Sequence, residues 1–339
     1  MSVDEVVKCI KSDTEKFWIC ALTKSKYFSR GIMGLTQKQL NSTLADINKA
    51  IGLKPGSARD CHYRGNIHYA KWELEKAIAD YTEAIRLDPD FAGAYYCRGV
   101  IYRYHKDDFA DAIRDFTEVI RLDPDDDAAY RLRGKACIRV KDPESAIRDF
   151  SEVIRLNPDQ AEAYIDRGGA YCFRGDLYDA AADYDNAVRD YSEAIRLDPD
   201  DYCAYLERGL CYCFDKKDYG NAIDDFNEML RIDPSDACAY CWRGDAHSGA
   251  GQHAAAVSDY TQALALASHL DAHFHEDEGF RSNVYVDRGK AYRSSGEDDK
   301  AAADFERAYT LNPKNDEAWE ALKSMAGYGK TTEYQEETT

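Results

Sequence analysis

Long apolar runs are absent from this sequence of 339 residues. No stretch of 18 apolar residues occurs, so no segment is expected to span a membrane. The opening residues carry acidic side chains and no apolar core of a leader, so they are not expected to be a secretory signal.

Positive charge is also scarce, because the sequence has 44 Lys and Arg against 63 Asp and Glu, a formal net charge of −19. Such a field repels phosphates and anionic lipids, which disfavours nucleic acid and membranes as partners.

The common enzyme motifs are absent as well. The sequence holds no G-x-x-x-x-G-K-[ST] phosphate loop, no H-E-x-x-H and no G-x-S-x-G. The acidic run Asp125–Asp127 stands at an expected turn, where Asp caps a helix. We therefore predict a non-enzymatic protein.

Eleven cysteines in such a chain indicate free thiols and a reducing compartment, for which the cytoplasm is the expectation.

What the sequence does contain is one segment written many times. Residues 91–124 read as two short helices joined by a turn, with apolar residues at helical spacing in each. The dipeptide Arg-Gly marks the repeats, with its Gly at 31, 65, 99, 134, 168, 209, 244 and 289. A further Arg-Gly, Arg174-Gly175, falls out of this register and is expected in a turn.

Two more positions recur in each repeat. A small residue follows the Gly by 12 or 13 residues, at Ala77, Ala112, Ala146, Ala180, Ala222, Ala256 and Ala301. An aromatic follows four residues later, at Tyr81, Phe116, Phe150, Tyr184, Phe226, Tyr260 and Phe305. Most repeats end on a proline, which cannot continue a helix. In the degraded first repeat Thr43 and Ile47 take the small and aromatic positions.

This pattern resembles the tetratricopeptide repeat family, whose repeats are about 34 residues long and form a helix, a turn and a helix. In the repeat at 90–124 the matching residues include Tyr95, Gly99, Ala112, Phe116 and Pro124. The resemblance implies an all-α, right-handed α-solenoid of about eight stacked repeats. It also implies that the protein holds a partner protein or peptide in a concave groove lined by the first helix of each repeat.

The expected domain organisation follows from the repeat positions. Residues 1–21 are expected to be a helical N-terminal capping segment, and 22–326 the solenoid. Its repeats lie near 22–56, 57–89, 90–124, 125–158, 159–199, 200–234, 235–275 and 276–313, followed by a capping helix at 314–326. Residues 327–339 lack apolar periodicity and are expected to be a disordered tail.

Two repeats are longer than the others. The fifth carries seven extra residues, near 184–190, which we place inside its second helix, where two added turns leave the apolar face nearly in phase. The seventh carries eleven extra residues after Ala263, near 264–283. These insertions are interpreted as tolerated surface growth, with partner binding along that edge as the alternative.

An arginine precedes every registered Gly, where the family usually has an apolar residue. These arginines are Arg30, Arg64, Arg98, Arg133, Arg167, Arg208, Arg243 and Arg288. An Asp precedes each aromatic position, at Asp46, Asp80, Asp115, Asp149, Asp183, Asp225, Asp259 and Asp304. A half-buried guanidinium needs a partner, so we predict an internal ladder of Arg–Asp pairs. A row of anion-binding arginines is the alternative.

Metal or redox chemistry is a second hypothesis for function, as a metal- or thiol-redox-responsive sensor. Cys238 and Cys241 form a C-x-x-C, with Cys203, Cys211 and Cys213 nearby in sequence. A structural zinc needs about four ligands and no second C-x-x-C exists, so packing thiols are the simpler interpretation. His269, His273 and His275 sit in the long insert of the seventh repeat, where a solvated loop is expected. No cofactor or metal is therefore predicted.

The groove is expected to be lined by residues that flank each repeat Gly. In repeats two to four these are Arg59, His62, Tyr63, Asn66, Tyr69, Tyr96, Arg103, Tyr104, Arg131, Lys135 and Arg139. In repeats five to eight they are Asp166, Phe173, Glu207, Phe214, Trp242, Asp245 and Asp287. The expected surface is aromatic throughout, basic early and acidic later, so a partner segment of complementary charge is predicted. A partner bound at the edge with the insertions is the alternative.

Overall fold

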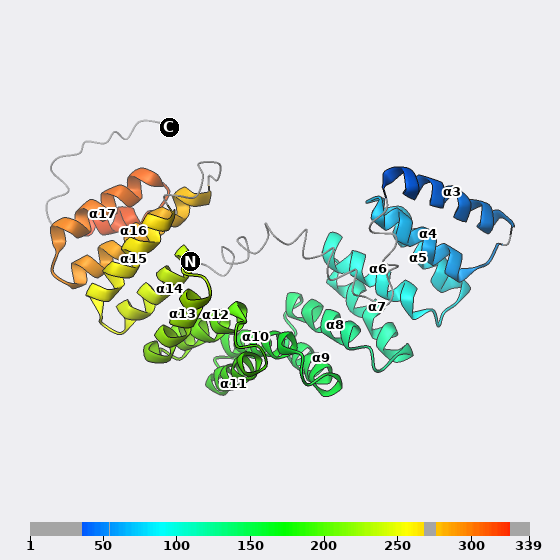
Figure 1. The fold of residues 1–339 in the computed structure, drawn as a ribbon, viewed down its shortest axis with the longest axis horizontal. Coiled ribbons are helices and arrows are strands. Elements are labelled where there is room, and N and C mark those ends of the chain that lie inside the picture. Colours follow the sequence, from blue (N-terminus) through cyan, green and yellow to red (C-terminus); the bar gives the residue numbers. More distant parts are fainter. Residues whose placement is uncertain (1–35, 54, 268–275, 326–339) are drawn as a thin grey trace. The chain divides into compact units, whose positions relative to one another are not determined.

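The computed structural model describes residues 36–53, 55–267 and 276–325. The predicted N-terminal capping segment, the C-terminal tail, Arg30 and the three histidines of the seventh repeat lie outside these ranges. The chain divides into two compact parts, an N-terminal part to Tyr178 and a C-terminal part from Asp179. Each part is described by itself (Figure 1).

The N-terminal part is a stack of helix pairs. Its helices are α3 (Gln37–Leu53), α4 (Ala58–Ala70), α5 (Leu74–Leu87), α6 (Ala92–His105), α7 (Phe109–Leu122), α8 (Asp127–Arg139), α9 (Pro143–Leu156) and α10 (Ala161–Tyr178). Each even-numbered helix is the first of a repeat. α4, α6 and α8 pack on the second helix of their own repeat and of the one before, and α10 packs on α9 of the repeat before. The first helices also contact one another, α4 with α6 and α8 with α10, so they form one side of the stack.

The C-terminal part continues the same alternation. It contains α11 (Ala181–Leu197), α12 (Tyr202–Leu210), the π-helical turn η1 (Cys211–Asp215), α13 (Tyr219–Ile232), α14 (Ala237–Gly249), α15 (His253–Ala267), α16 (Glu276–Ser294), α17 (Asp298–Leu311) and the capping helix α18 (Asp316–Ser324). Here the first helices α14 and α16 touch, and α18 closes on α17 as the predicted capping helix.

Local sequence sets where these helices begin. The side chain of Asp126 accepts a hydrogen bond from the backbone N–H of Ala129 at 3.0 Å, which confirms the capping role predicted for the acidic run. Asp108, Asp142, Asp218 and Asp236 cap their helices in the same way. These caps satisfy backbone donors that a helix N-terminus leaves unpaired.

The repeat glycine allows the two helices of a repeat to approach closely. A Cβ added at Gly65 would lie 2.5 Å from Cε1 of Tyr81, and one added at Gly289 would lie 2.6 Å from Cε1 of Phe305. Both aromatic rings are fully buried, and so are the small residues Ala77 and Ala301 of the same repeats. The recurring Gly, Ala and aromatic positions are therefore the interior of each helix pair.

The fifth repeat differs from the prediction. Arg174-Gly175 does not lie in a turn, because α10 is 18 residues long and contains it, with Gly175 buried. On α11 the buried residues Ala187, Asp190, Tyr191 and Ala194 take the small, acidic, aromatic and apolar positions. Ala180 precedes the helix as its N-cap.

The seven extra residues of the fifth repeat therefore belong mainly to its first helix. The pattern Gly, 16 residues, aromatic links Gly65 to Tyr81, and the same interval links Gly175 to Tyr191. α10 is four or five residues longer than the other first helices of the N-terminal part, whereas α11 is three longer than α9. The placement of the insertion inside the second helix was wrong, because two added turns preserve the face of either helix.

Candidate partner-binding surface

The predicted Arg–Asp ladder is present in six repeats. In each, Nε of the arginine donates to one carboxylate oxygen and Nη2 to an oxygen of the same carboxylate, at 2.6 to 3.0 Å. The pairs are Arg64–Asp80, Arg98–Asp115, Arg133–Asp149, Arg208–Asp225, Arg243–Asp259 and Arg288–Asp304. This two-point contact gives the charge pair a fixed geometry.

Each guanidinium uses its third nitrogen on the preceding repeat. Nη1 of Arg98 donates to Oγ1 of Thr82 at 2.9 Å, and Nη1 of Arg208 donates to Oγ of Ser192 at 2.8 Å. The acceptor follows the Asp of its own helix by two residues, as Thr82 follows Asp80. Ser192 thereby marks Asp190, not Asp183, as the ladder position of the fifth repeat. Including these bonds, each ladder arginine touches three helices.

The Arg–Asp pairs are shielded from solvent, so the charge of each aspartate depends on its arginine. The side chain of Asp115 is 3% exposed and that of Arg98 is 16% exposed. Burial raises the pKa of Asp115 more than the neighbouring Arg98 lowers it. The carboxylate therefore depends on its arginine to remain charged inside the protein.

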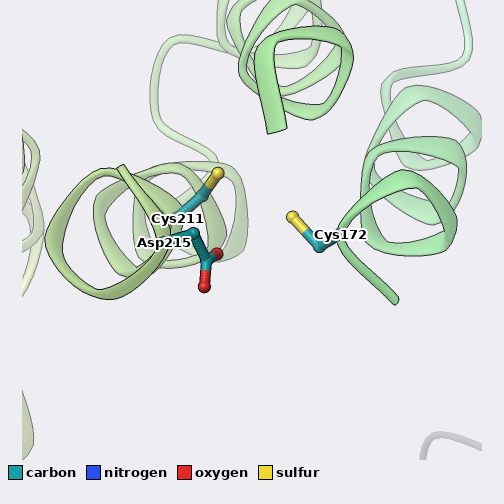
Figure 2. Close-up of side chains that lie close together, drawn as sticks. All are labelled: Cys172, Cys211 and Asp215. Atoms are coloured by element: carbon teal, nitrogen blue, oxygen red, sulfur yellow. The ribbon is translucent and has the colours of Figure 1, made fainter. Parts of the chain in front are cut away.

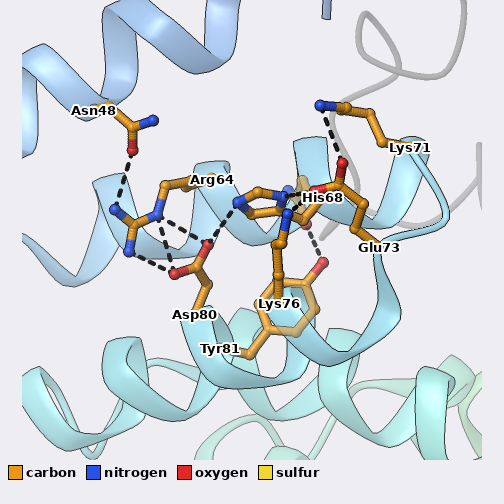
Figure 3. A network of polar contacts seen from close by, with 9 residues as sticks. Asn48, Arg64, His68, Lys71, Glu73, Lys76, Asp80 and Tyr81 are labelled. Carbon is orange, nitrogen blue, oxygen red and sulfur yellow. Dashed lines mark hydrogen bonds and ion pairs between the residues drawn. The ribbon is translucent and has the colours of Figure 1, made fainter. Parts of the chain in front are cut away.

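Figure 3 shows the second repeat, where the ladder is part of a larger polar network. Arg64 lies between Asp80 and Asn48, and the ring of His68 stands beside the same carboxylate, with Nε2 3.8 Å from Oδ2 of Asp80. On its other side His68 contacts Glu73 at 2.6 Å. The ring thus lies between the carboxylates of Asp80 and Glu73.

The predicted groove residues fall into three classes of exposure. Arg59, Tyr63, Arg139 and Phe214 are exposed. Nine are half-buried, namely Arg103, Tyr104, Arg131, Lys135, Asp166, Phe173, Glu207, Asp245 and Asp287. The expectation of exposure was wrong for five buried residues, His62, Asn66, Tyr69, Tyr96 and Trp242.

These five side chains are buried because they fill the interior. Nε2 of His62 lies 3.4 Å from Sγ of Cys97, one repeat further along the chain. The hydroxyl of Tyr69 lies 2.9 Å from Nε2 of His105. Trp242 stacks on Phe226 of the repeat before, with ring centroids 6.4 Å apart. The contact partners of His62 and Tyr69 lie 35 and 36 residues further along the chain, about one repeat, and that spacing was the available sequence signal for those two contacts.

Positive charge gathers on the first helices of the N-terminal part. Asp166 of α10 receives Nε of Arg131 at 2.6 Å and Nζ of Lys135 at 2.9 Å, both from α8. Arg103 of α6 stacks its guanidinium 4.0 Å from the ring centroid of Tyr104, and its Nε is buried without a hydrogen-bond acceptor. Burial lowers the pKa of Arg103 and of Lys135. Three cations thus lie around Asp166, and Glu162 is a second carboxylate near Arg131, so the cations outnumber the carboxylates, an arrangement that favours an added anion.

Negative charge gathers on the first helices of the C-terminal part. Burial raises the pKa of Glu207, which has no ion pair among the described residues. Burial and the neighbouring Asp287 raise the pKa of Asp245 to about 7, although the hydroxyl of Tyr260 donates to Asp245 at 2.7 Å. Asp287 is itself paired with Lys290 at 3.2 Å. A cation from outside would relieve both Glu207 and Asp245.

The cysteines of the described residues are all free thiols. Two of these thiols, Cys172 of α10 and Cys211 of η1, are labelled in Figure 2. Burial raises the pKa of Cys213 to about 12 and that of Cys241 well above its ordinary value. Because the thiolate is the reactive form, these two thiols are poorly suited to redox chemistry at neutral pH.

Both parts of the chain are repeat stacks of an α-solenoid, and family models agree with that class. A model described as TPR repeat matches residues 65–103, and models described as Tetratricopeptide repeat match 102–161, 174–237, 239–269 and 282–325. The chain belongs to the tetratricopeptide repeat family. Repeats of this kind form scaffolds for protein–protein interaction.

Solved structures of other repeat proteins share the fold. The C-terminal part of a TPR repeat-containing protein from Cytophaga hutchinsonii is 17% identical, with a TM-score of 0.63 over 77% of this chain and 99% of that chain. A tetratricopeptide repeat protein from Parabacteroides merdae is 20% identical, with a TM-score of 0.54 over 78% and 97%. PilW, a type IV pilus biogenesis factor, is 18% identical, with a TM-score of 0.53 over 68% and 98%.

No match was found among curated proteins. Within the described ranges, no helix has both the length and the apolar composition needed to cross a membrane.

Proposed function

We propose that the protein is a non-enzymatic adaptor that holds an extended segment of a partner protein along its first helices. The supporting observation is the uncompensated charge of that surface, positive around Arg103 in the N-terminal part and negative around Glu207 and Asp245 in the C-terminal part. A partner that is acidic where it meets the N-terminal part and basic where it meets the C-terminal part supplies the missing charges. The expected compartment is reducing and cytoplasmic, which suits the free thiols.

The aromatic residues of this surface supply contact area. Tyr63 is 41% exposed on α4, and Phe214 is 54% exposed on η1. Arg139 is exposed and lies 4.8 Å from the ring centroid of Phe109, which orients its guanidinium. Aromatic and arginine side chains commonly carry most of the binding energy at protein interfaces.

Neutralisation of Arg103 and Arg139 tests this function. The double variant Arg103→Gln, Arg139→Gln should bind its partner at least about ten-fold more weakly, because it removes cations from the surface. Arg131 is left intact because it holds Asp166 inside the stack. The matched control is Arg86→Gln on α5, which changes the net charge but lies on a second helix and is 68% exposed.

The assay is affinity capture from a native lysate, identification of the captured protein, and titration of its purified segment against each variant. Helical content and melting temperature should remain unchanged in all of them. Equal affinity of the double variant and the wild type would move the binding site away from the first helices of the N-terminal part.

A further inference from the structure

One position of the repeat is aromatic in every complete repeat except the fourth. It follows the repeat Gly by three residues, and it is His68, Tyr102, Tyr178, Tyr212, His247 or Tyr292 elsewhere, with Gly175 as the repeat Gly of the fifth repeat. In the fourth repeat it is Cys137, which is 3% exposed. A thiol replaces a ring there, and the ring is half-buried at Tyr102, Tyr212, His247 and Tyr292, so the fourth repeat lacks most of the volume of that side chain.

In four repeats the ring at this position lies beside the Arg–Asp pair of its repeat. Arg98 lies between two tyrosines, 5.8 Å from the ring centroid of Tyr95 and 6.0 Å from that of Tyr102. Arg288 lies likewise between Tyr285 at 5.3 Å and Tyr292 at 5.8 Å. In the second repeat His68 stands beside the carboxylate of Asp80, with Nε2 3.8 Å from Oδ2 (Figure 3). Such arrangements combine cation–π attraction with exclusion of water.

The fourth repeat has only the first half of this arrangement. Arg133 lies 5.7 Å from the ring centroid of Tyr130, and Cys137 takes the place of the second ring. A cavity of about 310 Å³ lies at that place, lined by Cys137, Arg133 and Asp149 among others. Its volume is at the lower end of the range for ligand pockets, roughly 300–1,000 Å³. Its rim includes Thr117 of α7 and Arg148 of α9, both exposed, so the cavity is open to solvent.

The walls of this cavity match the surroundings of Tyr102. Burial and the carboxylates of Asp115, Asp111 and Asp108 raise the pKa of that phenol. The residues at the same three positions in the fourth repeat are Asp149, Ser145 and Asp142, and all three line the cavity. The environment that holds a tyrosine ring in the third repeat is therefore present in the fourth, without the ring.

We propose that this cavity, the Cys137 pocket, receives a tyrosine side chain of a partner protein. The phenol ring completes the stack on Arg133, and its hydroxyl meets the polar wall at Ser145 and Asp142. Two carboxylates, Asp142 and Asp149, balance the two guanidinium groups of Arg133 and Arg148 in the lining, so the pocket offers no net positive charge for a carboxylate ligand. The proposal rests on the adaptor function in one respect, that a partner protein supplies the tyrosine ring. The pocket would be a second contact with that partner, between α7 and α9, in addition to the contact along the first helices.

Ligand-observed NMR with p-cresol, which reproduces the tyrosine side chain, tests the pocket on the full chain. The wild type should bind one p-cresol per chain, and 4-methylcyclohexanol should bind about two- to thirty-fold more weakly, the ratio given by a cation–π contact of ~0.5–2 kcal/mol. Cys137→Tyr should abolish binding and raise the melting temperature, because the protein then supplies the ring itself. Cys137→Ser is the matched control and should retain binding.

A gain of function makes the test independent of how Cys137→Tyr folds. Tyr102→Cys recreates the pocket in the third repeat, so this variant should bind two p-cresol molecules per chain. The proposal is overturned if the wild type binds no p-cresol, if the cyclohexanol binds equally well, or if a folded Cys137→Tyr still binds. Such results leave the adaptor function standing, because its own test depends on Arg103 and Arg139.

Discussion

Removal of Arg98 is the sharpest test of the ladder. The substitution Arg98→Ala deletes two bonds to the carboxylate of Asp115, at 2.9 and 2.7 Å, and one to Thr82 at 2.9 Å. Asp115 remains 3% exposed, with its compensating cation removed. Loss of one partner of a buried ion pair costs about 3–5 kcal/mol of unfolding free energy.

The pH dependence of this loss follows from the same carboxyl group. Without Arg98, the buried carboxylate of Asp115 can become neutral by binding a proton. At pH 7 this protonation costs about 4 kcal/mol for a group whose ordinary pKa is 3.8. That cost falls by about 1.4 kcal/mol for each pH unit, so at pH 5 it is only ~1.6 kcal/mol. A folded-state pKa raised above the unfolded value gives stability that is present at low pH and lost as pH rises. The variant should therefore lose about 3–4 kcal/mol at pH 7 and clearly less at pH 5.

Urea unfolding followed by circular dichroism at both pH values measures this loss. Arg86→Ala is the matched control, because the Arg86–Glu83 pair is 68% and 42% exposed and should contribute little to the free energy of unfolding. Replacement of both partners, Arg98→Met with Asp115→Leu, should restore most of the stability, since no charge is then stranded. A loss in Arg98→Ala that is no larger than in Arg86→Ala would refute the reasoning.

Two further predictions concern the interior of the C-terminal part. Gly289→Ala should cost about 1–3 kcal/mol, because the new Cβ would lie 2.6 Å from Phe305, whereas Gly279→Ala, with no atom within 4 Å, should gain up to about 1 kcal/mol of helix propensity. Equal thermal stability of these two variants would contradict the close approach. Asp245→Asn should leave stability unchanged at pH 4 and raise it at pH 8 by at most about 4 kcal/mol, because a pKa raised from 3.8 to about 7 makes the charged carboxylate costly above that pH. A pH-independent difference in melting temperature between wild type and Asp245→Asn would show that this carboxyl group is not the one responsible.

The sequence was sufficient for the ladder because its partners are set by local geometry. Two helices joined by a short turn place residues 16 or 17 apart side by side, as Arg64 and Asp80 are. The fifth repeat was misread because Arg167-Gly168 and Arg174-Gly175 are seven residues apart, nearly two turns, and so share a helix face. Only the bond from Arg208 to Ser192 establishes the ladder position on α11.

The partner-binding surface was less accessible to sequence reasoning. Position beside the repeat Gly identifies a helix face, but exposure also depends on the side chains that the neighbouring repeat places against it. Cys97 leaves room for His62 to bury its ring, and Phe226 provides the face on which Trp242 stacks. The pairing of Arg131 with Asp166 likewise joins two repeats, so the charge that remains for a partner is known only from the structure.

The hydrogen bond that Nη1 of each ladder arginine makes to the preceding repeat has a consequence for how the chain unfolds. Because Nη1 of Arg243 donates to Asn227 at 2.7 Å while its other nitrogens hold Asp259, melting of either neighbour breaks a contact of the same guanidinium. In a linear array whose repeats touch only their neighbours, such shared contacts act as coupling terms between adjacent folding events. A boundary between folded and unfolded repeats then carries its own free-energy penalty, so repeats within one stack should melt together and fraying should be confined to the ends.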